Sequence, residues 1–107
     1  MTRVVAFIPD LMDRSRLGSR PVELVTSLEQ LPSVAPGSSL VVVDLARPGA
    51  LEAAASLVGS GARIVGFAPH VDDELRSSAT ESGVEVVTRS WFFGHLDDLI
   101  PRAEPAG

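Results

Sequence analysis

Polar side chains that could do chemistry stand directly after four apolar runs of the sequence. Asp10 follows the first run and Asp44 ends the strongest one, while His70 follows the next, and Arg89 and Ser90 follow the last. If these runs are parallel strands, their carboxyl ends meet at one edge of a sheet, where functional groups gather in α/β folds. Because a buried carboxylate requires a partner, we expect Arg89 to pair with Asp44.

The apolar runs themselves are typical of strands buried on both faces of a sheet. Between them, capping residues and helical apolar spacings predict helices. This alternation predicts an α/β fold, a three-layer sandwich with a five-stranded parallel sheet in the flavodoxin-like order 2-1-3-4-5. We expect one domain over residues 1–102 and a disordered tail at 103–107. The expected strands are 3–8, 21–25, 40–44, 62–67 and 84–87, and a single last helix should contain His95 and stop at Pro101.

Composition removes several classes of function. The 107 residues include no cysteine, all nine basic residues are arginine, and the net charge is −5. Disulfides, thiolate nucleophiles and Schiff-base lysines are therefore excluded. An acidic chain is a poor match for nucleic acid or an anionic membrane, and no apolar run approaches the ~20 residues of a membrane span. We expect a soluble, cytoplasmic protein that binds neither.

Three segments resemble the receiver domains of bacterial response regulators. The segment 44–49, Asp-Leu-Ala-Arg-Pro-Gly, is similar to a D-L-x-x-P-G segment of that family, and segments 65–74 and 82–92 resemble its passages around strands 4 and 5. The resemblance covers nearly the whole chain. It implies that Asp44 occupies the phosphoacceptor position, and that the surface of helix 4, strand 5 and helix 5 serves a protein partner or a homodimer.

The departures from the family pattern change what the resemblance implies. Ile8 and Pro9 stand near the positions of the family's magnesium-binding acidic pair, which leaves Asp10 and Asp44 as weak candidates for a metal site. Ala68 replaces a hydroxyl residue, and Arg89 replaces a lysine, which is not an equivalent exchange. We therefore expect a non-enzymatic pseudo-receiver for protein interaction, without a cofactor, that phosphorylation of Asp44 does not switch.

Two other functions stay open, together with a candidate interface. A working single-domain response regulator would be phosphorylated on Asp44. A small anion- or ligand-binding protein would use the rim residues Arg89, Ser90 and His70, with Arg14 and Arg16 nearby. Three consecutive aromatic side chains at a helix start cannot all face the core, and exposed aromatic residues beside an arginine are typical of interface anchors. This candidate interface consists of Trp91, Phe92 and Phe93.

Overall fold

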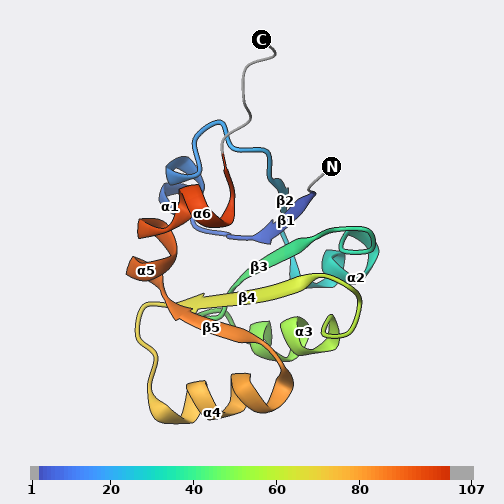
Figure 1. Cartoon of the computed structure of the whole chain (residues 1–107), viewed down its shortest axis with the longest axis vertical. Helices are drawn as coiled ribbons and strands as arrows, with labels where there is room; N and C mark the ends of the chain where they lie inside the picture. Colours follow the sequence, from blue (N-terminus) through green and yellow to red (C-terminus); the bar gives the residue numbers. More distant parts are fainter. Residues whose placement is uncertain (1–2, 102–107) are drawn as a thin grey trace.

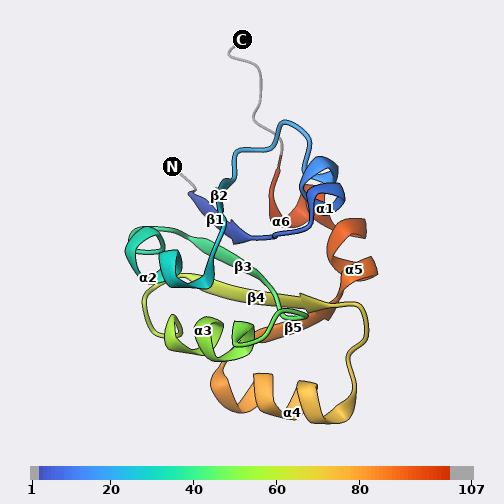
Figure 2. The same cartoon turned by 180° about the vertical axis from the view of Figure 1, so that it is seen from behind.

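The computed structural model describes residues 3–101, which form one parallel sheet with helices on both faces (Figures 1 and 2). The strand order is β2-β1-β3-β4-β5, so the predicted fold class and strand order are confirmed. The predicted tail at 103–107 lies outside the described residues. Within residues 3–101, no helix is both long enough and apolar enough to cross a membrane. The strands are β1 (Val4–Phe7), β2 (Glu23–Val25), β3 (Leu40–Asp44), β4 (Arg63–Ala68) and β5 (Glu85–Thr88).

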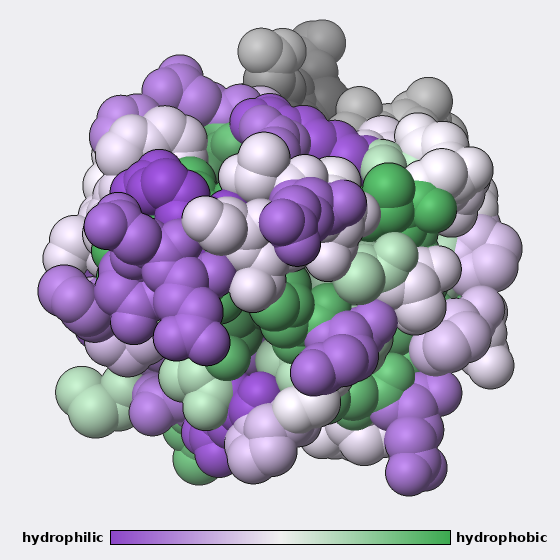
Figure 3. All heavy atoms as spheres, turned by 90° about the horizontal axis from the view of Figure 1, so that it is seen from below, coloured by the Kyte–Doolittle hydropathy of each residue, from purple (hydrophilic) through white to green (hydrophobic). Residues whose placement is uncertain are grey.

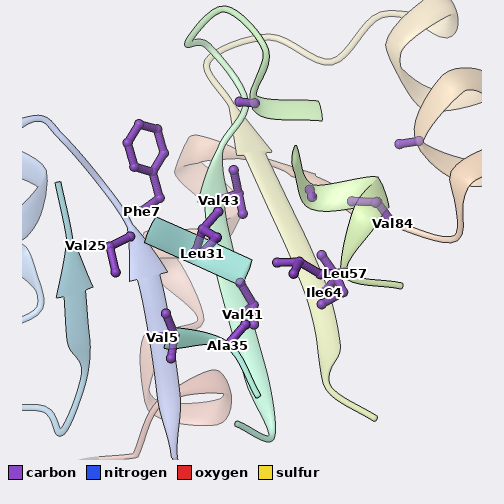
Figure 4. Close-up of a cluster of buried hydrophobic side chains, with 13 residues drawn as sticks. Val5, Phe7, Val25, Leu31, Ala35, Val41, Val43, Leu57, Ile64 and Val84 are labelled. Carbon is purple, nitrogen blue, oxygen red and sulfur yellow. The ribbon is translucent and has the colours of Figure 1, made fainter. Parts of the chain in front are cut away.

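Alternating side chains of the strands divide the core into two clusters, one on each face of the sheet. One cluster joins Val5, Val41 and Val43 to three helices, α2 (Leu31–Val34), α3 (Ala50–Ser56) and α4 (Asp73–Ser82) (Figure 4). On the other face, residues such as Val42 and Phe67 pack against α5 (Arg89–Gly94), α6 (Leu96–Leu99) and the end of α1 (Leu11–Arg16). The helices that follow the first and last strands therefore share one face (Figure 1).

The end of the chain corrects the prediction of a single last helix. The segment forms two short helices, α5 and α6, and His95 lies at the break between them. In a continuous helix the carbonyl of Trp91 would accept from the main-chain N–H of His95. Here that N–H donates to Phe92 O at 3.2 Å, and Trp91 O accepts from Nδ1 of the His95 ring at 2.7 Å. The imidazole thus competes for the carbonyl and ends the helix.

The short region between β2 and β3 follows the local signals of the sequence. A 3-10 helix, η1 (Leu28–Gln30), leads directly into α2. Oε1 of Gln30 accepts the main-chain N–H of Ser27 at 3.0 Å, as expected for the reciprocal contact of a capping box. This segment packs beside α3 on one face of the sheet.

Candidate functional site

A cavity of about 530 Å³ opens at the carboxyl edge of the sheet, where the sequence predicted a site. It lies where β3 ends and where α1 and α5 begin. Three carboxylates and two guanidiniums meet there, so the site is strongly polar and close to charge balance. Its lining residues are Asp10, Asp13, Asp44, Ala46, Arg47, Pro48, Pro69 and Arg89.

Asp44 is a buried acid at the end of the central strand, with 6 % of its surface exposed. Its Oδ1 accepts the main-chain N–H of Ala46 at 3.0 Å. Burial raises the pKa of Asp44 above its usual value of 3.8, while the Ala46 hydrogen bond and the charges of Arg47 and Arg89 act in the opposite direction. The neighbouring charge of Asp13 adds to the increase. Within residues 3–101, Asp44 makes no ion pair.

A glycine on the adjacent strand fixes the loop that carries these groups. Gly66 of β4 faces Leu45, and a Cβ added at Gly66 would lie 2.5 Å from Cδ1 of Leu45. The main-chain N–H of Leu45 also donates to Phe67 O at 2.8 Å, which extends the sheet pairing beyond Asp44. The close approach of Leu45 to β4 therefore sets the direction in which the loop leaves β3, and the main-chain N–H of Ala46 lies within hydrogen-bond distance of the Asp44 carboxylate.

The expected pair between Arg89 and Asp44 is wrong, because Arg89 binds Asp13 instead. Nε of Arg89 donates to Oδ2 of Asp13 at 3.2 Å, and its Nη2 contacts the other carboxylate oxygen. Asp13 is only 3 % exposed, and its hydrogen bond with Arg89 raises the pKa of that guanidinium above its ordinary value. The physical reason is the arrangement of layers: α1 and α5 lie on one face, so the first residue of α5 meets the first turns of α1.

In the sequence, Asp13 stands in the first turn of α1, where a carboxylate also favours the helix dipole. A signal for its role was nevertheless available. In the strand order 2-1-3-4-5, the helices after strands 1 and 5 cover the same face, so an acid early in one and an arginine at the start of the other are natural partners. Ion pairing between elements depends on which helical face each side chain occupies, and α1 is too short for its apolar pattern to define that face.

Asp10 acts as the cap of α1, as its position in the sequence indicated. Its Oδ1 accepts the main-chain N–H groups of Met12 at 2.8 Å and Asp13 at 3.0 Å. Of the three acids that line this cavity, Asp10 is engaged as a cap and Asp13 is held by Arg89, whereas Asp44 has neither an ionic nor a capping role. Mg²⁺ demands near-ideal octahedral geometry from oxygen ligands, and two of the three carboxylates that line this cavity are engaged in other contacts. Among the described residues, no three acids or histidines are grouped so that they could hold a metal.

The other predicted rim residues do not join the cavity lining. Ala68 is buried and pairs with Thr88 across the sheet. His70 and Ser90 are exposed, and neither lines the cavity. Thr88 caps α5, since its Oγ1 accepts the main-chain N–H of Trp91 at 3.1 Å.

The two arginines of α1, considered for anion binding, already have partners. Nε of Arg14 donates to Ile8 O at 2.6 Å. The guanidinium of Arg16 lies 4.2 Å from the ring centroid of Phe93, in a cation–π contact. Neither Arg14 nor Arg16 lines the cavity that holds Asp44.

The aromatic candidates divide between core and surface. Phe92 and Phe93 are buried against Phe67, with ring centroids 4.9 and 5.6 Å from the Phe67 ring. They are therefore core residues, and their assignment to an interface is wrong. Trp91 is 40 % exposed and stacks on His95 at 4.0 Å, which confirms that at least one of the three faces outward.

A second hollow, of about 570 Å³, runs along β5 between α4 and α5. Trp91 lies at the α5 side of this hollow, and Arg76 and Thr80 line its α4 side. Glu85 and Val86 form part of the floor. The surface of helix 4, strand 5 and helix 5 therefore contains a groove as well as an exposed aromatic side chain.

Comparison with known proteins adds no assignment, since neither the family models nor the curated protein sequences match this chain. The two hollows and the charged side chains that line them are therefore the features that bear on function. The first holds the buried Asp44 beside the Asp13–Arg89 ion pair. The second is bordered by Trp91 and the open edge of β5.

Proposed function

We propose that the protein is a non-catalytic interaction module of the pseudo-receiver type, whose α4–β5–α5 surface binds a protein partner. In this proposal, phosphorylation of Asp44 does not switch the module. The fold, the position of Asp44 at the end of β3 and the resemblance of segment 44–49 to receiver domains support the relationship. The departures around the cavity support the loss of phosphoryl chemistry.

The observation that carries the proposal is the ion pair between Asp13 and Arg89. Phosphoryl transfer to a carboxylate needs metal ligands and a free cation to neutralise developing charge. At this edge the cation that follows β5 is bound to an acid of α1, and Asp10 is bound to main-chain N–H groups. Ala68, the last residue of β4, supplies no hydroxyl at this edge. The ion pair therefore acts as a fixed link between α1 and α5.

Burial of Asp44 supports the same conclusion. A nucleophilic carboxylate must be ionised, and burial makes ionisation of Asp44 less favourable by raising its pKa. Its Oδ1 is also engaged by the main-chain N–H of Ala46. Asp44 thus holds the loop between β3 and α3, because its buried carboxylate accepts the main-chain N–H of the residue two positions later.

The test is phosphorylation by a small-molecule donor. The purified chain is incubated with acetyl phosphate and Mg²⁺, and its intact mass is measured beside that of Asp44→Asn. The proposal predicts no phosphoryl adduct on the wild-type chain under conditions that modify a functional receiver domain used as a positive control. An adduct that is present in the wild type and absent in Asp44→Asn would establish the alternative, a working response regulator.

A further inference from the structure

The outer edge of β5 is open. β5 is the last strand of the sheet, and within residues 3–101 it pairs only with β4. Val86 and Val87 are half-buried, whereas β1 and β3 are buried throughout. Seen from the side of α4 and α3, the molecule shows apolar surface in a hollow between strongly hydrophilic side chains (Figure 3). Residues of β5 and the turn before it line the groove from Gly83 to Val87.

We propose that this groove binds an extended acidic peptide segment of a partner protein, which adds to β5 as a sixth strand. The proposal rests on the interaction role proposed above and names the partner's chemistry. An unpaired strand edge presents main-chain N–H and C=O groups at the spacing that an extended peptide matches. The groove follows that edge, with α4 on one side and Trp91 on the other.

The charges along the groove favour an acidic occupant. Arg63 is neutralised by Glu85, which accepts from its Nη2 at 3.0 Å. Arg76 on α4 also lines the groove, and in the described part of the chain it makes no ion pair. Because the chain carries a net charge of −5, this unpaired guanidinium is a local positive charge on an acidic protein. A carboxylate of the incoming strand would pair with it.

Trp91 supplies the apolar part of the site. Its ring stacks on His95 with an interplanar angle of 14°, so the indole is held in place although it is exposed. A rigid aromatic side chain at the rim contacts an incoming side chain at little cost in conformational entropy. A second copy of this chain is a weaker occupant, because it would bring its own free Arg76 to the same groove.

Trp91 is the only tryptophan of the chain, so its fluorescence reports on the groove directly. The probe is a short capped peptide of alternating Glu and Val, titrated into the full chain. We expect a saturable change in Trp91 fluorescence and slower amide hydrogen exchange at residues 85–88. Arg76→Ala should weaken binding by about fivefold, the effect of one partly exposed ion pair, whereas Arg76→Lys keeps the charge and should retain most of the affinity.

Three results of the peptide titrations would overturn the strand-addition proposal. They are the absence of any response at millimolar peptide, equal binding of the matched Lys–Val peptide, and equal binding of a peptide whose main-chain amides are N-methylated. A fourth result is a dimer of the peptide-free chain in sedimentation, with the amides of residues 85–88 already protected from hydrogen exchange. That result would assign the edge to a second copy and would also overturn the proposal. A phosphoryl adduct on Asp44 refutes the pseudo-receiver function whatever the peptide does, so the two failures are distinguishable.

Discussion

Removal of the Arg89 guanidinium is predicted to destabilise the fold substantially. In Arg89→Ala, the carboxylate of Asp13 would remain 3 % exposed in the native arrangement with no cation beside it. Loss of one partner of a fully buried ion pair costs about 3–5 kcal/mol. The side chain of Arg89 is 39 % exposed, so water screens part of the interaction, and we expect a loss of about 2 kcal/mol. For a domain of this size, that corresponds to a decrease in Tm of roughly 8–16 °C.

The assay is urea unfolding of Asp13→Asn, Arg89→Ala and the double variant, from which a double-mutant cycle gives the coupling energy. We expect a coupling energy of about 1.5 kcal/mol or more between Asp13 and Arg89, since each side chain is the other's ionic partner. A matched cycle of Arg89→Ala with Asp44→Asn should give less than about 0.5 kcal/mol. Coupling of Arg89 to Asp44 that equals or exceeds its coupling to Asp13 would refute the assignment of the ion pair.

Three further substitutions test the cavity and its supports. Asp44→Asn should raise the free energy of unfolding at pH 7, by about 1.4 kcal/mol for each pKa unit relieved. Because burial raises the pKa of Asp44 in the folded state, its ionised form destabilises the fold above that pKa. The gain in unfolding free energy from Asn should therefore vanish as the pH falls towards 3.8. A gain that grows at low pH would contradict this reasoning. Gly66→Ala should lower the free energy of unfolding by about 1–3 kcal/mol, because the added methyl group clashes with Leu45. Urea unfolding measures this loss, and Leu45→Ala in the same chain should reduce it. Asp10→Ala should cost about 1 kcal/mol through loss of the α1 cap, whereas Asp10→Asn should be nearly neutral, and an equal loss in both variants would assign Asp10 a role as a charge.

The sheet was predictable because its signals are local. Continuous apolar runs with polar ends define buried strands wherever they occur in the chain, and the alternation with helices leaves few topologies. The cap formed by Asp10 and the bond between Gln30 and Ser27 were equally predictable, since each joins residues only a few positions apart.

The partner of Arg89 was not predictable by the same reasoning. Asp13 and Arg89 are 76 positions apart, and their contact depends on the rotation of α1, a helix of six residues. The argument from strand ends correctly placed Arg89 and Asp44 at one edge, but it did not consider the helices that cover the same face. The break at His95 was missed for a related reason, because a side chain that bonds the preceding turn leaves the apolar pattern unchanged.

The central claim is that the carboxyl edge holds Asp44 as a buried carboxyl group without phosphoryl chemistry. The most direct measurement is a pH titration of the Asp44 side-chain carboxyl carbon by NMR, with and without millimolar Mg²⁺. The account predicts a midpoint above the usual value for aspartate and no change in that midpoint when Mg²⁺ is added. A midpoint that falls on addition of Mg²⁺ would show a metal held at the carboxylate and would contradict the account.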